Sequence, residues 1–118
     1  MSFQGKTVVV TGGAHGIGKA ICELFEREGA HTAVIDLQDD VYFTGDISDK
    51  NVLEAFAQKV TADFGKVDVL VNNAPPLMKG IRDCTYEEFE HALKVGVKAP
   101  YYLSRLFLHY FAERASLI

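Results

Sequence analysis

The chain has 118 residues, of which 48% are apolar and 24% are charged, and its formal net charge at pH 7 is −4. This length and apolar content predict one domain, over residues 1–118. The negative charge and the scattered positions of the 12 Lys and Arg residues disfavour a nucleic-acid surface or an anionic-membrane surface.

No apolar run approaches the ~18 residues of a membrane span, and the first six residues lack the apolar core of a signal peptide. We therefore expect a cytoplasmic protein whose partner is a small molecule. The two cysteines and four histidines show no metal-ligand spacing, so no metal site is expected.

The predicted elements alternate between strand and helix, which is typical of an α/β fold with a mainly parallel, three-layer sheet of the Rossmann type. Ser48 and Thr85 are the predicted N-caps of the last two helices. Ser116–Ile118 indicates the opening of a further strand, so the sheet is expected to be incomplete at its carboxyl end. In chain order, the prediction is a strand at 6–11, a helix at 16–28, strands at 31–36 and 41–44, a helix at 49–63, a strand at 67–72 and a long helix from Tyr86 to about Glu113.

A glycine-rich turn joins the first predicted strand to the first predicted helix. It reads Thr-Gly-Gly-Ala-His-Gly-Ile-Gly over residues 11–18. Gly12 permits a sharp turn, Gly16 lets backbone N–H groups approach a pyrophosphate, and Gly18 lets the helix pack closely on the strand. The helix N-terminus then faces the anion. A tight turn in an ordinary α/β protein is the alternative that this pattern leaves open.

Polar residues follow the next predicted strands. Asp36 ends the second strand, where a carboxylate accepts both ribose hydroxyl groups of an adenosine and repels a 2′-phosphate. Asp46 follows the third strand, and Asn72 and Asn73 end the fourth. The alternatives are that the two aspartates are ordinary turn residues and that the asparagines cap the backbone.

Taken in order, these motifs resemble the amino-terminal half of a short-chain dehydrogenase/reductase over essentially the whole chain. The resemblance implies NAD as cofactor, with the pyrophosphate on the glycine loop and the ribose on Asp36. It also implies that Asp46 lies beside the adenine amine, that Ile47 flanks the ring and that the asparagines line the nicotinamide side. The cofactor-binding residues that it implies are Gly12, Ala14, His15, Gly16, Ile17, Gly18, Asp36, Leu37, Asp46, Ile47, Asn72, Asn73 and Ala74.

The catalytic groups of that family have no match here. Its members carry a Ser and a Tyr-x-x-x-Lys pair after the strand that is expected at Ser116, and this Tyr exchanges a proton with the substrate oxygen. None of the five tyrosines of this chain is followed by a lysine four residues later. No catalytic residue is therefore assigned, and the 118 residues alone are expected to be inactive.

Three further positions depart from the family pattern. Only four residues separate Asp36 from Val41, and they span roughly 17 Å at most, whereas a parallel crossover normally needs a dozen residues. An extended crossover is slightly favoured over an antiparallel hairpin. Pro75 replaces a glycine, so the loop must re-route if that glycine needs a positive φ. Gly96 replaces an Asn, which suggests either close packing against a neighbouring helix or a carbonyl open to water.

The sequence therefore predicts the NAD-binding part of an oxidoreductase that transfers hydride between NAD(H) and a carbonyl or secondary alcohol. A non-catalytic dinucleotide-binding or regulatory module is the alternative, and an inactive fragment is a third. Self-association through the helix 86–113 is also expected, because its apolar residues are too many for one face, and Tyr101 and Phe107 are the positions chosen to test it. The apolar residues in question are Phe89, Leu93, Tyr101, Tyr102, Leu106, Phe107, Tyr110 and Phe111.

Overall fold

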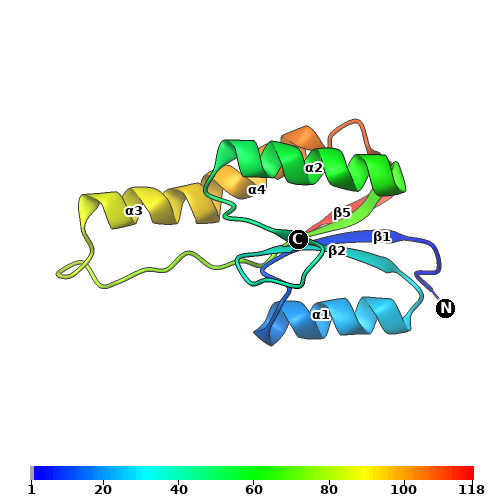
Figure 1. The fold of residues 1–118 in the computed structure, drawn as a ribbon, viewed down its shortest axis with the longest axis horizontal. Coiled ribbons are helices and arrows are strands. Elements are labelled where there is room, and N and C mark those ends of the chain that lie inside the picture. The colour runs from blue at the N-terminus through cyan, green and yellow to red at the C-terminus, as the bar shows by residue number, and fades with distance from the viewer. Residues whose placement is uncertain (1) are drawn as a thin grey trace.

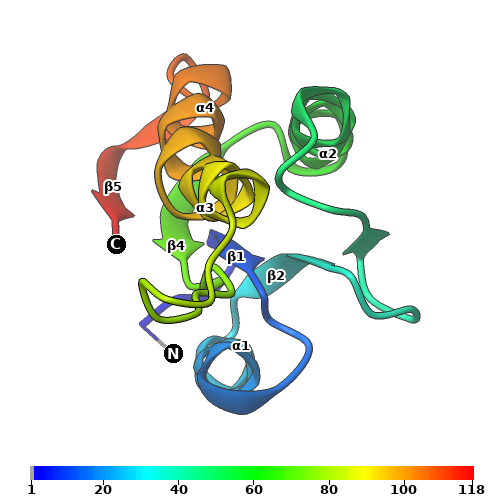
Figure 2. The same cartoon turned by 90° about the vertical axis from the view of Figure 1, so that its left-hand side faces the viewer.

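Five parallel strands form one sheet in the order β3-β2-β1-β4-β5, in a computed structural model that describes residues 2–118. Helix α1 covers one face of the sheet, and α2 and α4 cover the other (Figure 1, Figure 2). The predicted three-layer α/β fold of the Rossmann type is confirmed. The strands are β1 (Thr7–Thr11), β2 (His31–Asp36), β3 (Phe43–Thr44), β4 (Val67–Asn72) and β5 (Phe111–Leu117), and the helices are α1 (Gly16–Arg27), α2 (Lys50–Phe64), α3 (Tyr86–Leu93), the π-helical segment η1 (Lys94–Lys98) and α4 (Ala99–Leu106).

The central strand β1 is apolar on both faces because helices cover both sides of it. Residues 8–10 are all valine and fully buried, as is typical of a parallel strand between two helical layers. Val9 packs in the larger core cluster, with Phe56 of α2 and Leu103 of α4. The neighbouring valines pack with Cys22 of α1. The sheet is therefore held from both sides, and the carboxyl ends of its strands meet at one edge.

The short connection from β2 to β3 is a parallel crossover. Asp36 pairs with Thr44 in parallel register, so the predicted extended crossover is confirmed and the hairpin alternative is wrong. Asp40 adopts a φ of +61° within this connection, a conformation that Asp tolerates better than most residues. The Tyr42 hydroxyl donates a hydrogen bond to the Asp63 carboxylate of α2, which ties the connection to the helical layer. The third strand, β3, contains only Phe43 and Thr44, whereas the prediction was a strand over 41–44.

The long helix predicted over 86–113 is wrong after Leu106, where the helical stretch ends. Helix α4 ends at Leu106, and β5 begins at Phe111, earlier than predicted. The Val67 N–H of β4 donates to the Tyr110 carbonyl oxygen at 2.8 Å, so pairing at the sheet edge replaces helical hydrogen bonds. Apolar spacing alone did not reveal this change, because the aromatic residues of the segment also pack on the core as part of a turn and a strand.

The helix caps agree with prediction in one case of two. Thr85 caps α3 as predicted, in a capping box with Glu88. Asp49, rather than the predicted Ser48, caps α2, because its carboxylate accepts the Asn51 N–H at 2.8 Å. Both helices therefore begin within one residue of the predicted positions.

Gly96 lies in η1 and faces a loop. A Cβ atom at this position would lie 3.3 Å from Cγ of Pro76. The expected close packing is therefore present, but the neighbour is the Pro75–Pro76 segment and not a second helix. The two departures from the family pattern, a proline-containing loop and a helical glycine, meet at one place in the structure.

Candidate functional site

A cleft of about 260 Å³ lies at the carboxyl edge of the sheet. In parallel α/β sheets, ligands bind at this edge where the strand order reverses, which here is between β1 and β4. Seven of the predicted site residues line the cleft, and they come from the glycine loop, from the end of β2 and from the segments that follow β2, β3 and β4. These seven are Gly12, His15, Asp36, Leu37, Asp46, Ile47 and Ala74.

The glycine loop is shaped by close backbone contacts. Gly12 has a φ of +69°, and a Cβ atom there would lie 2.9 Å from the Ala74 Cα atom. A Cβ atom at Gly18 would lie 2.3 Å from the Gly12 carbonyl oxygen. Gly16 has a φ of +60° with open space beside it. These contacts agree with the predicted turn at Gly12 and the predicted close packing at Gly18, while Gly16 leaves the loop open on its outer side.

The amino-terminal end of α1 offers an anion site. His15 is the N-cap residue, but its side chain makes no capping hydrogen bond, and no acidic residue lies in the first turn. The first N–H groups of a helix have no partner within the helix, and they carry a partial positive charge. Ile17 lies in this turn with an exposed side chain. A phosphate group therefore fits this helix end, because it supplies the acceptors that the chain itself does not.

Asp36 links the end of β2 to the glycine loop. Its Oδ2 atom accepts the Ala14 N–H at 3.0 Å, and its Oδ1 atom accepts the Gln38 N–H at 3.1 Å. His15 Nδ1 lies 3.9 Å from Oδ2. Each carboxylate oxygen has two lone pairs, so each oxygen can accept a further hydrogen bond. The side chain is nearly buried, which fixes the carboxylate in place.

Asp46 and Ile47 form the opposite wall of the cleft together with His91 of α3. Asp46 Oδ1 accepts the Ser48 N–H at 2.9 Å, and Oδ2 lies 3.7 Å from His91 Nε2. Burial raises the pKa of Asp46, but the hydrogen bonds from Ser48 and the charge of a protonated His91 outweigh burial, and the pKa lies below the usual carboxyl value. The buried Ile47 side chain presents apolar surface beside this carboxylate.

The two asparagines at the end of β4 do not line the cleft. Asn73 Nδ2 donates to the carbonyl oxygens of Thr11 at 3.2 Å and Gly12 at 3.0 Å. Asn73 therefore stabilises the start of the glycine loop through its backbone. The Asn72 side chain lies near Ile118 beyond β5, with Nδ2 3.4 Å from its carbonyl oxygen. The backbone-capping alternative for these residues therefore describes Asn73 well. A role of either residue toward a nicotinamide stays a prediction.

Sequence reasoning missed part of the cleft. His91 and Val95 come from a helical stretch far along the chain, and no motif in the sequence connects them with the glycine loop. Pro75 departs from the family pattern, but that departure alone does not predict that it lines the cleft. The complete set of missed lining residues is Ile35, Gly45, Pro75, Leu77, His91 and Val95.

No tyrosine is present in the lining of this cleft, in the part of the chain that the structure describes. Within residues 2–118 there is also no group of three or more His, Cys, Asp or Glu residues placed to hold a metal ion. Over the same residues, no helix has the length and apolar character needed to cross a membrane.

Comparison with known proteins points to one family. A family model described as short chain dehydrogenase matches residues 6–116. Momilactone A synthase of Oryza sativa subsp. japonica is 35% identical over 115 residues, which cover 82% of this chain and 42% of that protein. An apo SCOR enzyme from Clostridium thermocellum has a TM-score of 0.88 at 38% identity, over 95% of this chain and 52% of that one.

A third similar protein is a metagenomic short-chain oxidoreductase that was solved in complex with NADP. Its TM-score is 0.85 at 29% identity, over 93% of this chain and 57% of that one. The chain thus spans about half the length of the proteins that it matches.

Proposed function

This chain belongs to the short chain dehydrogenase family, and from that premise we propose that its cleft binds a nicotinamide dinucleotide, with NAD(H) preferred to NADP(H). The pyrophosphate is assigned to the glycine loop, the adenosine ribose to Asp36, and the adenine to the wall formed by Asp46 and Ile47. When bound, the nicotinamide ring would supply hydride transfer in the interconversion of a secondary alcohol and a carbonyl.

One observation carries this proposal. The amino-terminal end of α1 has no side-chain cap and no acidic residue, and it opens on the same cleft that Asp36 lines from the end of β2. A site for a phosphate and a carboxylate for a ribose are therefore neighbours. Loop and carboxylate are also joined directly by the hydrogen bond from the Ala14 N–H to Asp36.

The preference for NAD(H) rests on charge. A 2′-phosphate at the Asp36 carboxylate is repelled, and proteins that accept NADP usually place an arginine nearby. The residue after Asp36 is Leu37, which is exposed and uncharged. His15 is the one titratable side chain of basic type within 4.0 Å of Asp36 among the described residues. NADP is the ligand of the similar metagenomic short-chain oxidoreductase, and titration with both cofactors decides the preference.

The residues of this chain are assigned to binding and orienting the dinucleotide, and none of them is assigned to proton transfer. The nucleotide cleft has an acceptor at Asp36, an uncapped helix end and an apolar wall, but no tyrosine within the described residues. We therefore propose that the 118 residues alone bind the dinucleotide without turnover.

A non-catalytic dinucleotide-binding or regulatory module is the second candidate. It is favoured by the absence of a lysine four residues after any tyrosine in these 118 residues. The sequence of the gene downstream of residue 118 discriminates between the two, because an in-frame Ser and Tyr-x-x-x-Lys supports the enzyme.

Self-association through the α3–η1–α4 segment also belongs to the proposal. Phe89, Leu93 and Tyr101 are exposed on this segment, which supports the sequence-based expectation. Phe107 is fully buried, so its use as an outer-face test position is wrong. The predicted cytoplasmic location stays a prediction.

Titration calorimetry of the 118-residue chain with NADH and NADPH tests the assignment. We expect NADH to bind at least about tenfold more tightly, which corresponds to ~1.4 kcal/mol. Asp36→Ala should narrow this difference, whereas Asp39→Ala, which removes an exposed carboxylate from the β2–β3 connection, should leave it unchanged.

Three outcomes contradict different parts of the proposal. Equal or tighter binding of NADPH overturns the NAD preference. Failure to bind either dinucleotide overturns the function as a whole. Cofactor-dependent turnover of an alcohol or a carbonyl that is lost in a Gly16→Asp variant overturns the expected inactivity of the 118 residues.

A further inference from the structure

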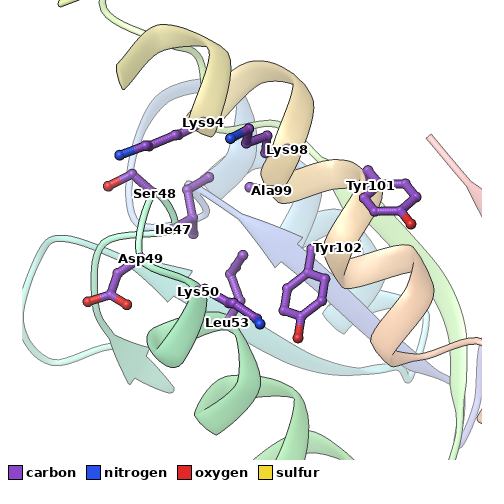
Figure 3. Close-up of a pocket in the computed structure, with 10 residues that line it drawn as sticks. All are labelled: Ile47, Ser48, Asp49, Lys50, Leu53, Lys94, Lys98, Ala99, Tyr101 and Tyr102. Atoms are coloured by element: carbon purple, nitrogen blue, oxygen red, sulfur yellow. The ribbon is translucent and has the colours of Figure 1, made fainter. Parts of the chain in front are cut away.

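A second cavity lies between the amino-terminal end of α2 and the segment formed by η1 and α4 (Figure 3). Its volume is about 720 Å³, within the range of ~300–1,000 Å³ that is typical of small-molecule sites. Ile47 is the one residue that lines both this cavity and the nucleotide cleft in the described chain. The two cavities are therefore neighbours that share Ile47 and differ in all their other lining residues.

Three lysines stand around this second cavity. Lys94 and Lys98 belong to η1 on one side, and Lys50 begins α2 on the other (Figure 3). Within residues 2–118, none of these ammonium groups has a carboxylate within 4.0 Å. Asp49 is the single carboxylate in the lining, and it already accepts the Asn51 N–H. In a chain of net charge −4, this is a local excess of positive charge.

The spacing of two of these lysines adds to that excess. Lys94 and Lys98 are four residues apart in one helical segment, and like charges at this spacing destabilise a helix. A negative group held between them removes the repulsion. The cavity is therefore suited to an anion on electrostatic grounds.

The floor of the second cavity is apolar. Ile47, Leu53 and Ala99 are buried, and Figure 3 shows Ile47 between Lys94 on one side and Lys50 on the other. Tyr102 adds an aromatic ring, with Lys50 Nζ 5.7 Å from the ring centroid. The Tyr102 hydroxyl already donates to Glu54 at 2.8 Å, so the ring is the part of this residue that is available to a ligand. A simple inorganic ion leaves the accessible face of the Tyr102 ring uncovered.

We propose that the second cavity binds an amphipathic anion, in which a carboxylate or phosphate group is carried on an aromatic or short acyl body. The anionic group lies toward Lys94 and Lys98, and the apolar body lies on Leu53, Ala99 and the Tyr102 ring. This inference does not depend on the dinucleotide assignment, because it rests on a different set of residues.

A two-dimensional ¹H–¹⁵N NMR titration of the 118-residue chain with phenyl phosphate tests the proposal. We expect saturable shifts of resonances in residues 47–53 and 94–102. Benzyl alcohol has a similar ring without the charge, and inorganic phosphate has the charge without the ring, so each should bind much more weakly. Lys94→Gln combined with Lys98→Gln should weaken phenyl phosphate binding by roughly tenfold.

A matched control removes the same charge from the other face of the sheet. Lys19→Gln combined with Arg27→Gln changes two exposed cations of α1 and should leave the affinity unchanged. An equal loss in both double variants would show a general charge effect and overturn the proposal. Shifts confined to residues 12–18 would place the phosphate on the glycine loop instead. Comparable affinity for benzyl alcohol or for inorganic phosphate alone would also overturn it.

Discussion

Asn72 and Asn73 are adjacent residues of one type with different surroundings. Asn73 Nδ2 donates to two backbone carbonyl oxygens of the glycine loop, those of Thr11 and Gly12. Asn72 Nδ2 makes one long contact with the Ile118 carbonyl oxygen, and its Oδ1 atom is buried without a partner among residues 2–118. Asn73 therefore stabilises the loop, whereas the Asn72 amide contributes little.

Alanine substitutions should separate the two asparagines. Asn73→Ala should lower the free energy of unfolding by about 1–3 kcal/mol, because two carbonyl oxygens lose their donor. Asn72→Ala should cost less than about 1 kcal/mol, because it removes one long contact and one unpartnered oxygen. Urea unfolding midpoints measure both, and equal losses would contradict the prediction.

The buried Asp68 carboxylate makes the stability of the fold depend on pH in the acid range. It accepts the Thr7 N–H at 2.8 Å and a hydrogen bond from the Lys66 ammonium group. Burial raises the pKa of Asp68, but the bonds from Lys66 and Thr7 outweigh burial, and the folded-state pKa lies below the ordinary carboxyl value. The stabilisation is therefore present above the unfolded pKa of ~3.9 and is lost as pH falls through the folded pKa.

Asp68→Asn should consequently be less stable than the unmodified chain at pH 7, and this difference should shrink below about pH 4. Asp39→Asn, at an exposed position, serves as the control and should show little difference at either pH. The measurement is the urea midpoint as a function of pH. A difference for Asp68→Asn that stays constant from pH 7 to pH 3 would falsify the assignment.

At the scale of residues, the sequence predicted those lining residues of the cleft that belong to a recognisable motif. Gly12 comes directly after β1 and Asp36 is the last residue of β2. Parallel strands bring residues at these positions to one edge of the sheet. His91 could not be predicted in this way, because its approach to Asp46 depends on the path of α3 over the sheet. The absence of a capping hydrogen bond at His15 could not be predicted either, because it depends on the orientation of the side chain.

At the scale of elements, the strands and helices that a local sequence pattern defines agree well with prediction. The second strand and the fourth agree with prediction at both ends, because each is a short apolar run that is bounded by polar residues. The end of α4 was missed, because β5 forms by pairing with β4 across the sheet. Apolar spacing indicates burial, and Phe107 is fully buried, but burial does not distinguish a turn from a helix.

Helix α3 extends beyond the edge of the sheet (Figure 1), so its start depends on local interactions. Thr85→Ala removes the hydroxyl that accepts the Glu88 N–H at 3.1 Å, and such a cap contributes about 1 kcal/mol. We expect faster amide hydrogen exchange in residues 86–90 with little change in the global unfolding midpoint. Thr61→Ala, in the interior of α2, is the control that should leave this exchange unaltered. Unchanged protection of residues 86–90 in Thr85→Ala would contradict the prediction.

At the scale of the whole molecule, the structure is elongated, with principal extents of 48 × 27 × 25 Å. The α3–η1–α4 segment lies along the long direction (Figure 1). Exposed apolar residues recur every four positions on it, at Phe89, Leu93, Val97 and Tyr101. Residues at this spacing are neighbours on a helix surface, and a contiguous apolar patch of several hundred Å² usually marks an interface. The chain therefore has a surface that a second copy can cover.

Val97→Glu tests this surface without disturbing the core, because Val97 is 60% exposed. We expect the unmodified chain to sediment as a dimer at micromolar concentration, and the variant to raise the dimer dissociation constant by at least roughly tenfold, because a charge would be buried without a partner. Leu24→Glu on α1, where the side chain is 55% exposed, removes a similar apolar group from the opposite face and should leave the dimer intact. Sedimentation velocity across a concentration series measures both variants. A folded, concentration-independent monomer of the unmodified chain would exclude the interface, and equal weakening by the two variants would move the contact away from α3–η1–α4.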